Sequence, residues 1–169
     1  PDPLARNDDQ FDWIAPAKGL SWLDVGCGNG AFTDEIIARY APAKIAAVDP
    51  SEGHLAYARS RPGATLAEFR IADAQRLPFD DRSFDVAAMA LVISFVPDPA
   101  KAAAEMARVV RPGGTAATYM WDFSIDGAPV DPIYRALRAI GIEPPRPPHH
   151  AVATPDGLRR GAPSSPSVR

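Results

Sequence analysis

Closely spaced glycines and single acidic residues at the ends of apolar runs give this chain a pattern suited to binding a charged nucleotide. Gly26, Gly28 and Gly30 form a loop directly after the apolar stretch Leu20–Val25, and Asp24 lies just before that loop. A strand followed by a glycine-rich turn and a helix is typical of nucleotide-binding α/β units. A turn that only holds a pyrophosphate has little use for a carboxylate beside it. Asp24 therefore indicates a ligand that carries an ammonium or a sulfonium group.

Two further aspartates follow apolar runs later in the chain. Asp49 lies 19 residues after Gly30, a spacing that suits a carboxylate accepting hydrogen bonds from the two hydroxyls of a ribose. Asp73 follows the next apolar run and suits the exocyclic amine of an adenine. Ligands of such sheets bind at the carboxyl ends of the strands, so these carboxylates are expected to converge at one edge. A nucleoside that carries a cationic amino acid fits all of them, and S-adenosylmethionine is such a molecule.

Strand and helix patterns alternate along the chain and position these residues. The expected strands are Leu20–Val25, Lys44–Val48, Leu66–Ile71, Phe84–Ile93 and Thr115–Trp121. The expected helices are Ala31–Tyr40, one capped by Ser51 that runs to about Ser60, one that Asp98 and Pro99 open and Arg111–Gly114 closes, and Pro132–Ile140. This alternation predicts an α/β fold: a Rossmann-like, doubly wound and mostly parallel sheet in three layers.

Composition narrows the class of protein. The chain has 169 residues, 46% of them hydrophobic, and a net charge of −3, which predicts one domain with a real core. It has no basic run, so no nucleic-acid partner is expected, and its longest apolar stretch, Val86–Val96, is too short to span a membrane. The single cysteine, Cys27, excludes an internal disulfide, and neither it nor His54, His149 or His150 is expected to bind a metal. No signal peptide is recognised, which makes the cytoplasm the expected location.

Six segments of the chain resemble the class I S-adenosylmethionine-dependent methyltransferases, above all the small-molecule branch that includes ubiquinone/menaquinone-type C-methyltransferases. They follow the family's order and spacing from about Trp13 to Gly141, and they are Leu23–Gly30, Val48–Ser51, Ala72–Phe79, Ser83–Val86, Val96–Pro99 and Arg108–Gly114. The resemblance implies a methyltransferase of the EC 2.1.1 class, with S-adenosylmethionine as cofactor and a small molecule as methyl acceptor.

The resemblance also implies which residues hold the cofactor. They are Asp24, Gly26, Gly28 and Gly30 for the methionine part, Asp49 and Pro50 for the ribose, Asp73, Ala74 and Gln75 for the adenine, and Met89 with Ala90 for the pocket wall. No catalytic base is assigned. Asp122, Tyr119 and Ser94 lie near the expected strand ends, but none has the features of a base. A base is needed only if the acceptor must lose a proton.

Two other functions stay open at this point. Gly26, Gly28 and Ala31 also fit the G-x-G-x-x-A spacing of nicotinamide enzymes, although that reading leaves Asp24 and Asp73 unexplained. The chain is alternatively a non-catalytic, truncated remnant that still binds the cofactor. Binding of S-adenosylhomocysteine or NAD distinguishes the oxidoreductase from the other two.

Both ends of the chain depart from the family pattern. The domain is expected over residues 1–142, whereas residues 143–169 form a tail rich in Pro, Ser and Arg that is expected to be largely disordered. The chain begins with Pro1, which suggests trimming, and the family's last two strands are expected to be missing through truncation or a changed reading frame after about Arg160. The strand Thr115–Trp121 would then have an open edge, which favours self-association.

Overall fold

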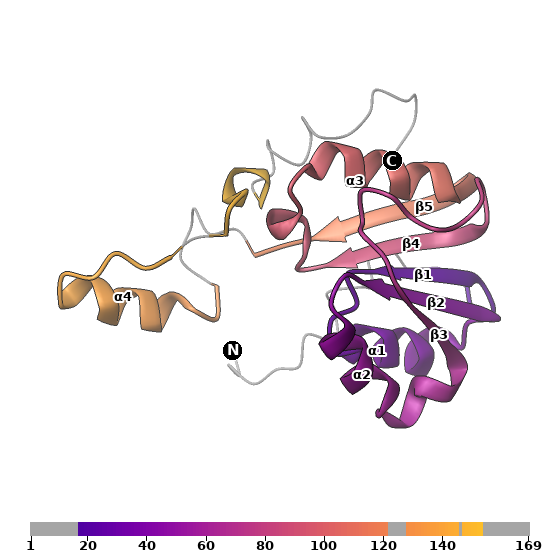
Figure 1. Ribbon diagram of the computed structural model, residues 1–169, viewed down its shortest axis with the longest axis horizontal. Helices are drawn as coiled ribbons and strands as arrows, with labels where there is room; N and C mark the ends of the chain where they lie inside the picture. The colour runs from indigo at the N-terminus through magenta and orange to yellow at the C-terminus, as the bar shows by residue number, and fades with distance from the viewer. Residues whose placement is uncertain (1–16, 122–127, 146, 154–169) are drawn as a thin grey trace.

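Five parallel strands form the centre of the protein (Figure 1). The computed structural model describes residues 17–121, 128–145 and 147–153. The strands lie in the order β3-β2-β1-β4-β5, and they are β1 (Ser21–Val25), β2 (Lys44–Asp49), β3 (Ala67–Ile71), β4 (Phe84–Ala90) and β5 (Val110–Tyr119). The predicted Rossmann-like α/β fold is therefore confirmed. The order reverses between β1 and β4, which places the expected ligand site at the carboxyl ends of these two strands.

The helices begin where the sequence indicates. They are α1 (Ala31–Tyr40), α2 (Glu52–Arg59), α3 (Pro99–Val109) and α4 (Asp131–Ala139), with short 3-10 turns η2 (Pro62–Leu66), η3 (Ile93–Phe95) and η4 (His150–Ala153). Ser51 caps α2 by accepting a 3.3 Å hydrogen bond from the N–H of His54. Asp98 caps α3 in the same way, 3.0 Å from the N–H of Lys101. Each cap satisfies an N–H group that the first helical turn leaves unpaired.

The helices cover the two faces of the sheet. α1 and α2 lie on one face and α3 on the other (Figure 1). Successive residues of β1 alternate between the faces, as a strand requires. Trp22 packs with Ile36 of α1, whereas Leu23 packs with Met106 of α3. Both faces are therefore apolar, and the three-layer prediction is confirmed.

β4 is shorter than predicted. It ends at Ala90 rather than Ile93 because Leu91 adopts a left-handed backbone, with φ of 61°. That conformation is costly for a residue with a side chain. The chain then turns into η3, so Ile93, although buried, belongs to a 3-10 turn and not to the strand.

β5 begins earlier than predicted and ends earlier as well. It runs from Val110, directly after α3, so the Arg111–Gly114 segment is part of the strand instead of a separate helix stop. Phe84 lies opposite Val110 but Val86 lies opposite Thr115, which marks a bulge in β5. An added Cβ at Gly114 would lie 2.4 Å from the carbonyl oxygen of Asp85, so the two strands approach closely there.

The segments after β5 differ in how they contact the sheet. α4, which the sequence predicts to within about one residue, lies apart from the sheet in Figure 1 and has no buried residue. Residues 147–153 return to the domain, where the N–H of His149 donates a 2.9 Å hydrogen bond to the carbonyl of Ser94 and Val152 packs against the core. The rest of the predicted tail, from residue 154 onward, lies outside the described residues. In the described part of the chain, no helix has the length and apolar character needed to cross a membrane.

Candidate functional site

The glycine loop is bound to the end of the neighbouring strand. The N–H groups of Gly26 and Cys27 both donate to the carbonyl of Val48, at 2.8 and 2.9 Å. The N–H of Gly28 donates to Oδ2 of Asp49 at 2.9 Å. These bonds join the carboxyl ends of β1 and β2, so two of the three predicted ligand segments are brought together.

The three glycines of the loop are required for different reasons. All have positive φ, of 75°, 53° and 80° in turn. An added Cβ at Gly26 would lie 2.6 Å from the side chain of Val92, and one at Gly30 would lie 3.0 Å from the Cβ of Ala58. A Cβ at Gly28 would meet nothing within 4 Å. Gly26 and Gly30 thus allow the protein to pack, whereas Gly28 faces open space in which a ligand can lie close to the backbone.

Asp24 is completely buried beneath this loop. Its Oδ2 accepts a 2.6 Å hydrogen bond from the hydroxyl of Thr33, and its Oδ1 has no hydrogen-bond partner among the residues that the structure describes. Burial raises the pKa of Asp24 to about 7, the Thr33 hydrogen bond opposes this rise, and the negative charge of Asp49 adds to it. A nearby positive charge would stabilise the ionised carboxylate, which agrees with the ligand charge expected from the sequence.

Asp49 is almost fully hydrogen-bonded within the protein. Oδ1 lies 2.9 Å from the N–H of Ser51 and 3.1 Å from Nδ1 of His54, and Oδ2 accepts from Gly28. A carboxylate has about four acceptor positions, so these contacts leave about one, on Oδ2. The side chain of His54 is 61% exposed, and its contact with Asp49 is not apparent from the sequence. The adjacent Pro50 is exposed at the same edge.

The predicted adenine segment forms a tight turn after β3. The N–H of Ala72 donates to the carbonyl of Asp49 at 3.2 Å, which joins this turn to β2. The Asp73 carboxylate accepts from the backbone and side-chain amide of Gln75, at 2.8 to 3.1 Å. Asp73 is exposed and Ala74 is buried. The turn therefore presents a carboxylate to solvent at the same edge of the sheet as Asp49.

The remaining predicted residues differ in accessibility. Met89 is 1% exposed and lies in the hydrophobic core beside α3, whereas Ala90 is half-buried. Met89 supports the site from the core, and the accessible surface at the end of β4 belongs to Ala90. Because the period of a strand is two, adjacent residues of β4 face opposite sides, and the sequence does not reveal which of the two is covered.

The candidate proton acceptors differ in their burial and in the groups that surround them. Ser94 is fully buried, and within the described part of the chain its hydroxyl has no hydrogen-bond partner. Tyr119 is half-buried at the end of β5 with its ring edge-on to Phe32, and burial together with the charge of Asp24 raises its pKa. Asp122 lies outside the described residues. In the described ranges, no group of three or more metal-binding side chains is present.

Comparison with known proteins establishes the family. A family model described as "Methyltransferase domain" matches residues 23–118, which is more than half of the chain. This chain belongs to the class I S-adenosylmethionine-dependent methyltransferases. The match includes the glycine loop, the end of β2, the turn after β3 and nearly all of β5. The methyltransferase domain therefore includes every segment that forms the candidate site.

Individual proteins similar to this chain are also methyltransferases. A demethylmenaquinone methyltransferase of Clavibacter sepedonicus is 39% identical over 102 residues, which cover 60% of this chain and 41% of the relative. A trans-aconitate 2-methyltransferase of Methylobacterium nodulans is 35% identical over 132 residues, covering 78% and 46%. The crystal structure of an S-adenosylmethionine-dependent methyltransferase from Mesorhizobium loti matches with a TM-score of 0.59 and 28% identity, covering 66% of this chain and 51% of that one. The chain spans less than half the length of these two curated relatives.

Proposed function

We propose that this chain binds S-adenosylmethionine at the carboxyl ends of β1, β2 and β3 and transfers its methyl group to a small-molecule acceptor. The observation that carries the proposal is the 2.9 Å hydrogen bond from the Gly28 N–H to Asp49. It places an open glycine backbone directly beside a carboxylate, as a ligand with both an amino-acid part and a ribose requires. The buried, unpartnered Oδ1 of Asp24 and the open space at Gly28 both fit such a ligand.

Each segment of the site has a separate role in this proposal. Gly28 lets the methionine part lie against the backbone, and Asp24 provides the negative charge beneath it. Asp49 accepts a hydrogen bond from a ribose hydroxyl at its remaining acceptor position. The Asp73 carboxylate accepts a hydrogen bond from the exocyclic amine of the adenine, with Gln75 beside it. S-adenosylmethionine, when bound, supplies an electrophilic methyl group.

The chain's own contribution to the transfer is mainly positional. The described site residues bind and orient the cofactor, and holding its methyl group in line with the acceptor is an effective form of catalysis for such a displacement. The methyl acceptor is proposed only as a small molecule, which is consistent with the relatives' names.

Calorimetric titration with S-adenosylhomocysteine tests the binding part of the proposal. We expect saturable binding to the wild-type chain and no binding of NAD under the same conditions. The opposite result would support the nicotinamide oxidoreductase and contradict the proposal. The family match and the exposed Asp73 carboxylate both favour the methyltransferase.

A methyl-transfer screen tests the catalytic part. Radiolabelled S-adenosylmethionine is incubated with panels of phenols, quinones, amines and carboxylates, and transfer to any of them above that of a Gly28→Val variant supports an active enzyme. Cofactor binding without transfer to any class would instead support the non-catalytic remnant.

A further inference from the structure

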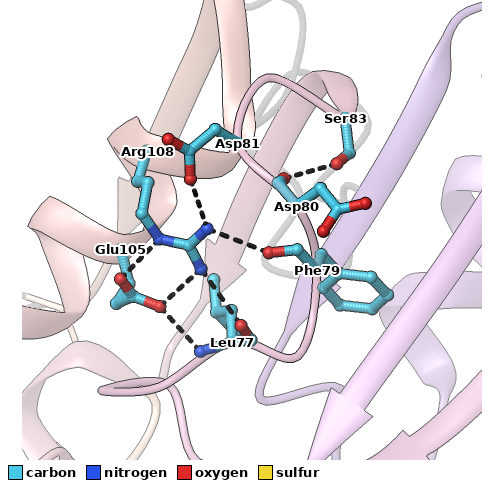
Figure 2. A network of polar contacts seen from close by, with 7 residues as sticks. All are labelled: Leu77, Phe79, Asp80, Asp81, Ser83, Glu105 and Arg108. Atoms are coloured by element: carbon cyan, nitrogen blue, oxygen red, sulfur yellow. Dashed lines mark hydrogen bonds and ion pairs between the residues drawn. The ribbon is translucent and has the colours of Figure 1, made fainter.

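One arginine of α3 binds the loop that follows the predicted adenine turn (Figure 2). The guanidinium of Arg108 donates to both carboxylate oxygens of Glu105, at 2.7 and 2.8 Å. It also donates to the carbonyl oxygens of Leu77 and Phe79, at 3.0 and 2.9 Å, and to Oδ1 of Asp81 at 2.8 Å. An arginine side chain has five N–H donors. These contacts use all of them.

Glu105 and the backbone of Arg108 complete the attachment. Oε2 of Glu105 accepts a 2.8 Å hydrogen bond from the N–H of Leu77. Leu77 is thus held at both of its backbone polar groups, one by Glu105 and the other by Arg108. The carbonyl of Arg108 accepts from the N–H of Arg82 at 2.9 Å. The loop is therefore fixed to α3 at several successive points between residues 77 and 82.

This attachment begins directly after the end of the turn that follows β3. The turn closes through a 2.9 Å hydrogen bond from the Arg76 N–H to the Asp73 carbonyl, and the next residue is Leu77. The start of the turn is held by the hydrogen bond that the Ala72 N–H donates to the carbonyl of Asp49. The Asp73 carboxylate accepts hydrogen bonds from the backbone and side-chain amide of Gln75, inside the same turn. The two backbone anchors thus help to fix the position of that carboxylate, together with the burial of Ala74 inside the turn.

We propose that Arg108, acting with Glu105, is a positioning residue that sets how strictly the site selects a 6-aminopurine. This inference rests on the proposed function, because it needs a cofactor whose base lies at Asp73. A carboxylate attracts the exocyclic amine of adenine and repels the carbonyl that hypoxanthine has at the same place. Discrimination between the two bases requires the carboxylate to be fixed. If the turn shifts, the preference for the amine weakens.

A lysine cannot replace Arg108 in this role. An ammonium is a compact charge on a flexible stem with three donors, whereas the planar guanidinium binds Glu105 bidentately and reaches three further oxygens. Arg108→Lys keeps the charge and most of the packing but cannot make every contact. It therefore changes the attachment of the loop with little change in the electrostatics of the site.

The test compares the affinities of S-adenosylhomocysteine and S-inosylhomocysteine by calorimetry. We expect the wild-type chain to prefer S-adenosylhomocysteine by at least about tenfold, because the fixed Asp73 carboxylate loses a hydrogen bond and faces a carbonyl in S-inosylhomocysteine. Arg108→Lys should reduce the preference to about threefold or less, mainly through weaker binding of the adenine compound. Arg111→Lys is the matched control, since Arg111 pairs with Asp85 at the opposite end of the sheet. Its preference should equal that of the wild type.

The other outcomes are equally informative. A folded Arg108→Lys variant that melts earlier but keeps the wild-type preference would show a purely structural role and overturn the inference. If Arg108→Lys does not fold, Glu105→Gln, which retains an acceptor for the Leu77 N–H, is measured in the same way. Equal binding of both compounds by the wild type would also overturn the inference. Failure of the wild type to bind S-adenosylhomocysteine would instead contradict the proposed function itself.

Discussion

The hydroxyl of Thr33 donates a 2.6 Å hydrogen bond to Oδ2 of Asp24, and both residues are completely shielded from solvent. Thr33 lies in the first turn of α1 and Asp24 near the end of β1, so this contact joins the two elements on either side of the glycine loop. One hydrogen bond does not compensate for burial of the charge, and the pKa of Asp24 remains raised to about 7. The folded state therefore favours the protonated acid.

This raised pKa predicts a pH dependence of stability. The contribution of Asp24 to the free energy of unfolding is fully present below its ordinary pKa of 3.8, declines from there, and is lost as the pH rises through about 7. Asp24→Asn, which stays neutral, lacks this decline. Urea unfolding of both proteins between pH 4 and 8 should show the variant gaining stability relative to the wild type as the pH rises. A constant difference over this range would contradict the assignment.

A second prediction concerns the ribose. Asp49→Ala should weaken S-adenosylhomocysteine binding by roughly 2–4 kcal/mol, because the ribose loses a charged acceptor at a largely buried position. His54→Gln is the control, since His54 contacts the same carboxylate but its side chain is mostly exposed, and a contact made by an exposed side chain contributes little. Its affinity should stay within about twofold of the wild type. Calorimetry measures both, and equal affinities for Asp49→Ala and the wild type would remove Asp49 from the site.

A third prediction separates ligand space from backbone strain in the glycine loop. Gly28→Val should abolish cofactor binding, because the new side chain extends into open space beside the backbone. Gly113 also has positive φ and nothing within 4 Å of an added Cβ, but it lies in the β5 bulge. Gly113→Val therefore introduces a similar strain away from the site. We expect both variants to unfold at a lower temperature than the wild type, and only Gly28→Val to lose cofactor binding. Normal binding by Gly28→Val would show that the loop does not touch the ligand.

A fourth prediction concerns self-association. β5 is the outermost strand of the described sheet, and an unpaired strand edge can bind another chain. We expect the 169-residue chain to form a dimer through β5 or to be poorly soluble, with low activity. Ala116→Lys adds a charge at an exposed position of β5 and should increase the monomer fraction in light scattering, whereas Ala100→Lys on the exposed face of α3 should not. A stable, active wild-type monomer would show that this edge is covered.

Local patterns carry most of what the sequence predicts correctly. α1 follows from its apolar spacing, and the starts of α2 and α3 follow from the capping residues Ser51 and Asp98, because each signal lies within a few residues of the element that it defines. The position of Asp49 beside the glycine loop follows from the general rule that ligand-binding segments lie at the carboxyl ends of parallel strands. These parts of the fold and the site need no knowledge of distant contacts.

The features that sequence analysis misses depend on contacts between distant segments. The Arg111–Gly114 segment has the composition of a turn, and only the close approach of Gly114 to Asp85 makes it a bulge within β5. In the sequence, Arg108 cannot be distinguished from an ordinary surface arginine of α3. Its role depends on the path that residues 77–82 take beside this helix. His149 reaches Ser94 across a proline-rich segment. No local propensity encodes the geometry of any of these contacts.

The pairing of β1 with β4 has a consequence for synthesis of the protein on the ribosome. β2 follows β1 after a single helix, but the partner that closes the other side of β1 is 64 residues away, as in the bond from the Ser21 N–H to Asp85. A nascent chain that has emerged through β3 therefore contains the glycine loop and Asp49 but lacks Val92, which covers Gly26. Long-range pairing of this kind is slow to form. Until β4 has emerged, one edge of the central strand β1 lacks its partner strand, and an unpaired edge of this kind favours aggregation.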